Sequence, residues 1–166
     1  MPTMRRVVLR EWGGELELEE GPIPEPGPGE LRLRVEACGV GSTLRNVRAG
    51  RMAGMPGATL PRVLGNEIVG TVEAAGPGAD RSRIGQRGIV HFYLTCDRCW
   101  QCRWGHDPLC SDLRGLVGVS IDGGFAEHVV VPAANVVPFP AGVPAPEAAV
   151  TADAVATPWH ALTRVA

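Results

Sequence analysis

Four of the five cysteines in this chain lie in the short stretch "CDRCWQCRWGHDPLC". They are Cys96, Cys99, Cys102 and Cys110, with the spacing C-x2-C-x2-C-x7-C. Such a compact loop can present four thiolates to one tetrahedral Zn²⁺ ion at about 2.3 Å. The side chains between the cysteines are mostly polar, so metal binding rather than a buried core is expected to order the loop. Because four protein ligands leave no open position, the spacing predicts a structural zinc site, one ion per chain.

Two other uses of these cysteines are less compatible with the sequence. Paired disulfides suit small secreted proteins with an insufficient core, whereas this chain has 166 residues, an apolar share of 45% and no signal segment at its start. An iron–sulfur run ends with a gap of about three residues followed by proline. The last gap here is seven residues. Zinc in a reducing compartment is therefore favoured, and we expect the cytoplasm.

Length and composition predict one ordinary globular domain and exclude several partners. The length suits a single domain with a real hydrophobic core. A net charge of -2, without a basic stripe interleaved with aromatic residues, argues against nucleic acid. No apolar run approaches the roughly twenty residues of a membrane-spanning helix, so no membrane partner is expected.

The elements that must position the loop are mainly β-strands. In "LRLRVEAC", Leu31 and Leu33 alternate with Arg32 and Arg34, which is typical of a half-buried strand. Other alternating runs are separated by Gly- and Pro-rich turns. They are residues 4–10, 68–74, 88–93, 125–131 and 136–139. Strands at this spacing predict a partly open barrel. Only residues 146–165 are predicted to be helical, with an interruption at Thr157-Pro158.

The sequence resembles the N-terminal, GroES-like catalytic domain of zinc-containing alcohol dehydrogenases in the medium-chain dehydrogenase/reductase family. The resemblance rests on "VEACGVGST", "LPRVLGNEIVGTV", the cysteine loop, "GGFAEHVVVPAANVVPFPAGV" and "DAVATPWHAL", which cover nearly the whole chain in the family's order. It implies a GroES-like fold for residues 1–150 and an oxidoreductase function. It also implies that Cys96, Cys99, Cys102 and Cys110 are the structural zinc ligands.

The sequence departs from this family at the catalytic metal. Gly41 stands where the family has a zinc-binding cysteine, and Asn66 stands where it has a histidine. An amide is a poor zinc ligand beside imidazole. Leu44 replaces an acidic residue that the family places beside the metal, and Cys38 lies three positions too early to serve. The catalytic zinc is therefore predicted to be lost.

Several residues of the implied catalytic site remain. Thr43 occupies the position whose hydroxyl contacts the substrate oxygen, and Asn46 stands where many members carry a proton-relay histidine. Glu67 and Asp153 resemble the acidic residue beside the metal and the third ligand. Two carboxylates and an amide would form a looser, more hydrated site than zinc catalysis needs. We favour the interpretation that Glu67 and Asp153 are hydrogen-bonded residues lining a cleft that has lost its metal.

Loss of the metal would change the chemistry. Zinc polarises a carbonyl or alkoxide oxygen, so alcohol oxidation would lose its main charge stabilisation. Reduction of an activated alkene or quinone remains feasible, with Thr43 or Asn46 donating a hydrogen bond to the small-molecule substrate. The alternative is a non-catalytic zinc-binding module for assembly or for binding a small molecule.

The nucleotide cofactor has no site in this sequence. NAD(P) binds to a Rossmann domain with a G-x-G-x-x-G turn, and no such motif is present. Residues 151–166 resemble the helix that leads into the family's nucleotide-binding domain. We therefore expect a piece of a longer protein, a homo-oligomer when whole, and no turnover by this chain alone; a natural stand-alone domain is the other possibility.

Overall fold

The computed structural model describes residues 2–165, and most of them lie in strands, turns and short helices. The strands are β1 (Thr3–Leu9), β2 (Leu16–Pro22), β3 (Glu30–Gly39), β4 (Arg62–Val63), β5 (Glu67–Ala75), β6 (Arg87–Val90), β7 (His128–Pro132) and β8 (Val136–Pro138). The helices are α1 (Ser42–Arg48), α2 (Trp100–Arg103), α3 (Ala145–Val150) and α4 (Ala156–Val165), joined by 3-10 turns η1 (Arg81–Arg83), η2 (Asp107–Leu109) and η3 (Ala133–Asn135) and a π-helical turn η4 (Thr151–Val155).

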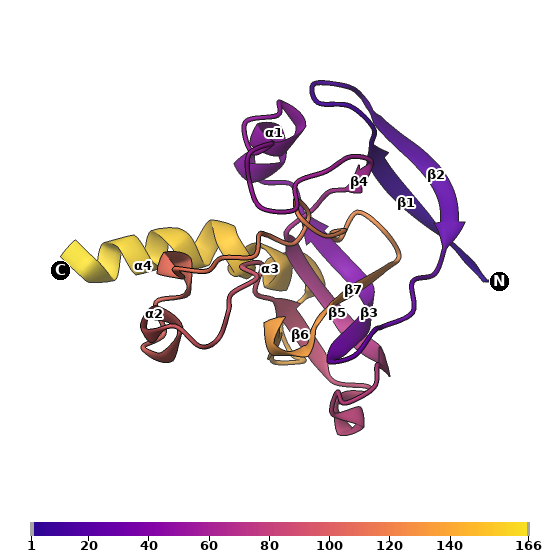
Figure 1. The fold of residues 1–166 in the computed structure, drawn as a ribbon. Coiled ribbons are helices and arrows are strands. Elements are labelled where there is room, and N and C mark those ends of the chain that lie inside the picture. Colours follow the sequence, from indigo (N-terminus) through magenta and orange to yellow (C-terminus); the bar gives the residue numbers. More distant parts are fainter. Residues whose placement is uncertain (1, 166) are drawn as a thin grey trace.

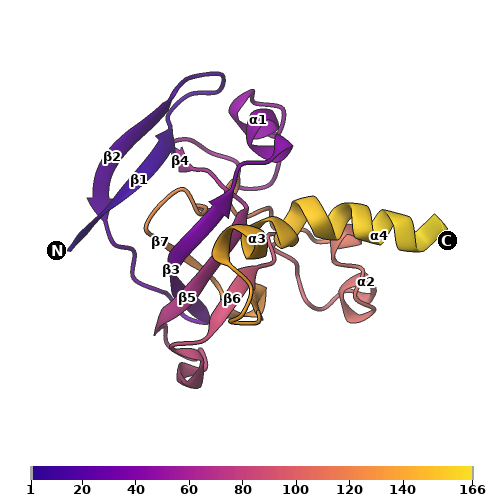
Figure 2. The ribbon, with the colours of Figure 1, turned by 180° about the vertical axis from the view of Figure 1, so that it is seen from behind.

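The strands form two antiparallel sheets. One has the order β2-β1-β4 and the other β7-β3-β5-β6-β8. Strand β3 lies between β7 and β5. Its Leu31 and Leu33 are fully buried, while its Arg34 is exposed, as the alternation predicts. The predicted mainly β, GroES-like fold is confirmed, and the sheets of the described residues do not close into a barrel. In Figures 1 and 2 the sheets form one body, from which α4 projects beside the loop that carries α2.

Several predicted boundaries were wrong, and two strands and two helices were missed. The strand expected at residues 88–93 ends at Val90, and the one expected from Phe125 begins at His128. The strands β2 and β4 and the helices α1 and α2 were not predicted. Helix α1 is only seven residues long, and it forms because Val47 packs into the core with Leu44 beside it. Tertiary burial, not a long periodic pattern, therefore stabilises the helix that carries Thr43.

The predicted interruption of the C-terminal helix at Thr157-Pro158 was also wrong. Helix α4 continues through both residues, and the irregularity lies just before them, in the π-helical turn η4. Proline lacks an N–H and its ring crowds the carbonyl four residues earlier, which is Ala154 here. The π-helical turn Thr151–Val155 includes Ala154, so the irregularity falls where the proline ring requires more room. This turn places Asp153 toward the sheets.

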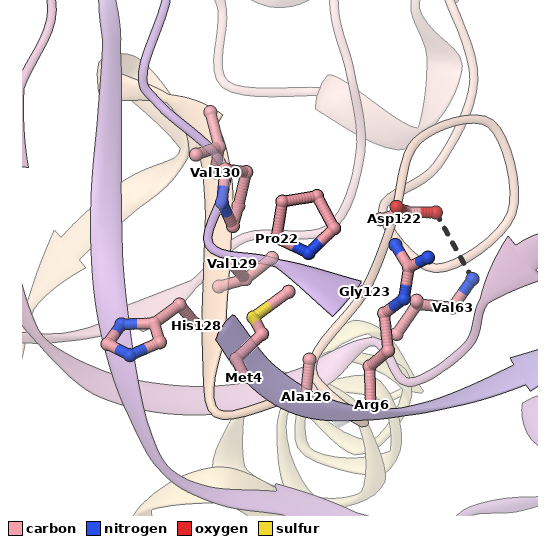
Figure 3. Close-up of a pocket in the computed structure, with 11 residues that line it drawn as sticks. Met4, Arg6, Pro22, Val63, Asp122, Gly123, Ala126, His128, Val129 and Val130 are labelled. Atoms are coloured by element: carbon pink, nitrogen blue, oxygen red, sulfur yellow. Dashed lines mark hydrogen bonds between the residues drawn. The ribbon is translucent and has the colours of Figure 1, made fainter. Parts of the chain in front are cut away.

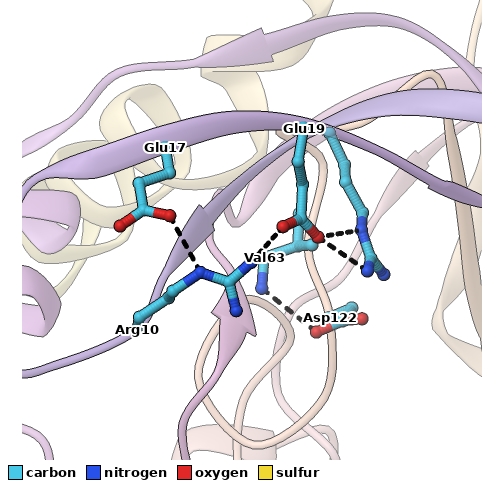
Figure 4. A network of polar contacts seen from close by, with 6 residues as sticks. Arg10, Glu17, Glu19, Val63 and Asp122 are labelled. Atoms are coloured by element: carbon cyan, nitrogen blue, oxygen red, sulfur yellow. Dashed lines mark hydrogen bonds and ion pairs between the residues drawn. The ribbon is translucent and has the colours of Figure 1, made fainter.

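Polar contacts fix β4 and hence the loop that follows it. The Asp122 carboxylate accepts hydrogen bonds from the Val63 N–H and from Arg62 Nη1, both at 3.1 Å. Figure 4 shows this contact beside Arg10, which pairs with Glu17 at 2.8 Å and also contacts Glu19. These exposed ion pairs contribute little stability individually. The Asp122 contacts matter because they position β4, and residues 64–67 follow β4 directly.

Replacing Gly123 by alanine is expected to destabilise the fold strongly. A Cβ at this position would lie 2.1 Å from the carbonyl oxygen of Gly65 and 2.7 Å from that of Leu64. Backbone cannot give way as a side chain can, so we expect a loss of about 2–4 kcal/mol in the free energy of unfolding. Urea unfolding measures it. Gly54→Ala is the matched control, because a Cβ there meets nothing within 4 Å. Equal stability of both variants would contradict this close-packing argument.

Candidate functional site

The four-cysteine loop brings its sulfur atoms to one point. The Sγ atoms of Cys96, Cys99, Cys102 and Cys110 all lie within 4.8 Å of one another. Cys99 Sγ and Cys102 Sγ are 3.3 Å apart, and Cys96 Sγ and Cys102 Sγ are 4.0 Å apart. Thiolates bound to one zinc ion at about 2.3 Å are separated by comparable distances. All five cysteines of the chain are free thiols, so the cluster indicates a structural zinc site.

Backbone amides stabilise the thiolates of Cys96 and Cys99 in this loop, whereas burial raises the pKa of the Cys102 thiol to about 12. Hydrogen bonds from the N–H groups of Arg98 and Cys99 lower the pKa of the Cys96 thiol. Those from Cys102 and Ser111 lower the pKa of Cys99. The same turns position the sulfurs, because Cys99 N lies 3.4 Å from Cys96 Sγ. Zinc binds the thiolate form, so this geometry favours the metal.

The second candidate site gathers residues from three elements around Asp153. Asp153 Oδ2 accepts hydrogen bonds from Asn66 Nδ2 at 3.1 Å and, over a longer 3.3 Å, from Thr43 Oγ1 on α1. Its other oxygen accepts from Thr157 Oγ1 at 2.9 Å. The structure thus brings Thr43, Asn66 and Asp153 together. These hydrogen bonds join three of the residues that the resemblance assigns to the catalytic site.

Glu67 lies beside this cluster and is almost completely buried. Glu67 is only 3% exposed, and its Oε1 atom accepts a hydrogen bond from the Ala154 N–H at 3.1 Å. Burial, with the nearby Asp153 charge, raises the pKa of the Glu67 carboxyl above its ordinary value of 4.5. The buried Glu67 carboxyl and the Asp153 carboxylate therefore lie near each other.

Asn46 does not join the cluster. Its side-chain oxygen accepts a hydrogen bond from Arg51 Nη1 at 3.1 Å, on the next turn of the chain. No hydrogen bond of Asn46 reaches Thr43, Asn66, Glu67 or Asp153 within residues 2–165. The resemblance placed it at a relay position, but the structure assigns its amide to Arg51.

The donor set around Asp153 does not fit a catalytic zinc. The amide nitrogen of Asn66 donates to Asp153, and Gly41 offers no side chain. A Cβ at Gly41 would lie 3.3 Å from Glu67 Oε1, so the Glu67 carboxylate borders the space of the missing cysteine. Burial and the Glu67 charge raise the pKa of the Cys38 thiol to about 12, which keeps it protonated. Among the described residues, only the four-cysteine loop groups three or more metal-binding side chains.

Sequence reasoning missed one residue of this region, Tyr93, which is the only tyrosine in the chain. It lines a cavity of about 350 Å³ together with Ala152, Ala156 and Thr157, the neighbours of Asp153. Burial, with a smaller contribution from the Asp153 charge, raises the pKa of the phenol. No motif marks this residue; only the approach of the C-terminal helix reveals it.

The Asp153→Asn variant is expected to lower the pKa of Tyr93 while leaving it above the ordinary value of 10.0. A negative charge nearby disfavours a phenolate, whereas the larger effect of burial remains in the variant. Because the chain has a single tyrosine, ultraviolet absorbance of the phenolate during a pH titration measures this group alone. The Asp122→Asn variant is the control, since Asp122 contacts β4 instead. An unchanged midpoint in Asp153→Asn would show that the two groups are not close.

A separate cavity of about 230 Å³ lies between the small sheet and β7. Figure 3 shows Met4, Pro22 and Val129 around it, with His128 and Arg6 at its edge. None of the candidate site residues lines this cavity. Among residues 2–165, no helix is both long and apolar enough to cross a bilayer.

Together, two antiparallel sheets, a four-cysteine metal loop and a polar cleft at the start of the C-terminal helix define the class of this domain. The family model for the alcohol dehydrogenase GroES-like domain matches residues 27–141. The chain belongs to this family.

Known relatives agree with this assignment and are longer than the chain. It is 35% identical to L-threonine 3-dehydrogenase of Stenotrophomonas maltophilia over 150 residues, covering 88% of this chain and 43% of the relative. The cobalt- and zinc-bound thermostable alcohol dehydrogenase of Pyrobaculum aerophilum superposes with a TM-score of 0.88 at 34% identity, over 98% of this chain and 49% of that one. Acetophenone reductase of Geotrichum candidum, solved with NAD, superposes with a TM-score of 0.85 at 36% identity, over 99% of this chain and 48% of that one. The chain thus spans less than half the length of each.

Proposed function

We propose that this chain is the catalytic-domain portion of an NAD(P)-dependent, alcohol dehydrogenase-like oxidoreductase in which the structural zinc site is retained and the catalytic zinc site is lost. Its substrate is a small molecule whose oxygen is bound by protein hydrogen bonds instead of by a metal. Residues 1–150 form the GroES-like domain, and residues 151–166 lead toward a nucleotide-binding domain.

The observation that carries this proposal is the hydrogen bond between Asn66 and Asp153. In a zinc site, two ligands at these positions would both direct lone pairs at a metal. Here an amide donor faces a carboxylate acceptor at 3.1 Å, so the two residues satisfy each other directly. The contact supports a cleft held by hydrogen bonds.

The cofactor does not fit the residues of this chain. Nicotinamide dinucleotides bind at the carboxyl ends of parallel strands. The named strands here pair only in antiparallel ladders. No step of hydride transfer is therefore assigned to these residues. Their own contributions are to orient the substrate, to bind its oxygen and to exclude water from the base of the cleft.

Zinc stoichiometry tests the proposed loss of the catalytic metal. The chain is purified under reducing conditions without added metal, and zinc per chain is measured by elemental mass spectrometry. One zinc is expected, because among residues 2–165 only the four-cysteine loop offers a complete ligand set. Two zinc ions per chain would overturn the proposal and restore metal-assisted alcohol oxidation as the function.

A homo-oligomer is also part of this proposal. The four-cysteine loop carries three exposed apolar side chains: Trp100 is 62% exposed, Trp104 is 72% exposed and Leu109 is 68% exposed. The ring centroids of the two tryptophans are 5.9 Å apart. Aromatic side chains gathered on a surface are typical of protein contacts. Analytical ultracentrifugation of the intact enzyme tests this, with Trp104→Glu expected to weaken the association and a monomeric wild type contradicting it.

A further inference from the structure

Tyr93 is held in place by a buried amide. Its backbone carbonyl accepts a hydrogen bond from Asn135 Nδ2 at 2.8 Å, and the same amide bonds the carbonyl of His91 at 2.6 Å. Asn135 is only 7% exposed. The Tyr93 ring also stacks on Phe92 with centroids 4.7 Å apart. These contacts fix the segment, so the position of the phenol ring is determined by packing.

The cavity beside Tyr93 has the size and lining of a small-molecule site. Its volume is about 350 Å³, within the usual range for ligand pockets. Phe92, Pro108, Ala152 and Ala156 give it an apolar wall, and Thr157 connects it to the Asp153 cluster. His91 and His160 also line it, and His91 Nε2 lies 3.3 Å from Asp107 Oδ2. A ligand with a small apolar body and one polar atom matches this lining.

The two hydroxyl groups beside Asp153, on Thr43 and Thr157, already donate to its carboxylate. A carboxylate only accepts, so Thr43, Asn66 and Thr157 each direct a proton toward Asp153. The Tyr93 hydroxyl, in contrast, forms no hydrogen bond with any side chain or backbone group of residues 2–165. Its raised pKa keeps it protonated at neutral pH. Tyr93 is therefore the uncommitted hydroxyl donor at this cavity.

We propose that Tyr93 is the hydrogen-bond donor that binds the carbonyl oxygen of a small ketone or enone in this cavity. This inference deepens the proposed function and rests on it: without a metal at the cleft, a protein donor must polarise the oxygen. It replaces the expectation that Thr43 or Asn46 has this role, because Thr43 faces Asp153 and Asn46 faces Arg51. The apolar wall selects for the hydrocarbon part of the ligand.

The single tyrosine gives this proposal a site-specific test. The chain is produced with fluorotyrosine and titrated with cyclohexenone, and then with cyclohexene, which has nearly the same shape but no oxygen. We expect a saturable fluorine resonance shift that is large for the ketone and small for the hydrocarbon. No saturable shift at the solubility limit of the ketone, or equal shifts for the two ligands, would overturn the proposal.

Variants then distinguish Tyr93 from Thr43 as the hydrogen-bond donor to the ketone. Amide chemical shifts of the isotope-labelled chain give the Kd of cyclohexenone. Tyr93→Phe is expected to weaken ketone binding about 2- to 10-fold, the effect of one hydrogen bond, and to leave cyclohexene binding unchanged. Thr43→Val should change ketone affinity less than Tyr93→Phe. If Thr43→Val has the larger effect, or Tyr93→Phe has none, Tyr93 is not the donor. The zinc count does not enter this test, so the proposed function and this inference fail separately.

Discussion

Replacing Cys96 with serine is expected to reduce the zinc content of the chain from one ion to none and to unfold the loop between β6 and the strands that follow it. Cys96 is 6% exposed and contacts the other thiols of the cluster. The intervening residues Asp97 and Arg98 are exposed and add no buried core, so we expect metal binding to supply most of the free energy that orders this part of the loop. Losing a structural metal is among the few single changes that cost more than about 4 kcal/mol.

Elemental mass spectrometry and thermal unfolding measure the two effects. The expected fall in Tm is at least about 10 °C for a domain of this size. The fifth cysteine provides the matched control: Cys38→Ser removes a thiol that lies beside Gly65 and Gly124, outside the cluster, and should retain one zinc. A Cys96→Ser protein with full zinc content and an unchanged Tm would contradict a structural zinc site.

The double variant Gly41→Cys, Asn66→His is expected to gain a second zinc ion. The two substitutions add a thiolate and an imidazole beside Asp153, which gives the three protein ligands typical of a catalytic zinc site. Asn66 already lies 3.1 Å from Asp153. The new Cβ at residue 41 would lie 3.3 Å from Glu67 Oε1, so the carboxylate must move by a few tenths of an ångström. Its side chain is long enough to do so.

Zinc per chain and the absorption spectrum of the cobalt-substituted protein measure this gain. We expect two metal ions per chain in the double variant and one in the control Gly54→Cys, Asn66→His. Gly54 lies in open space, so the control adds the same side chains without bringing them together. If the double variant still binds one zinc, or if the control also binds two, then residues 41, 66 and 153 do not enclose a metal position.

The sequence predicted the features that depend on local pattern. Alternation along "LRLRVEAC" predicted a half-buried strand, because side chains on a strand point to opposite faces in turn. The short helices and strands were harder to predict from the sequence. Helix α1 and strand β4 have seven and two residues, so too few positions repeat to reveal a period, and only packing against the core stabilises them.

The candidate site shows the same division. Gly41 and Asn66 could be recognised from the sequence as departures from a metal-binding pattern, because the resemblance assigns a role to each position. The bond from Asn66 to Asp153, in contrast, joins residues 87 positions apart. Its geometry depends on the π-helical turn and on β4 together, and no local pattern specifies either.

By itself, the sequence determined the mainly β fold class and the four-cysteine spacing, because each depends on residue type and on distance along the chain. The two departures at Gly41 and Asn66 could be seen only through the resemblance to a family. Only the tertiary structure decided that Asn46 contacts Arg51 and that Tyr93 lines a cavity together with Ala152, Ala156 and Thr157. The physical reason is that a hydrogen bond requires its two groups within about 3 Å. For residues on different elements, the packing of those elements sets that distance.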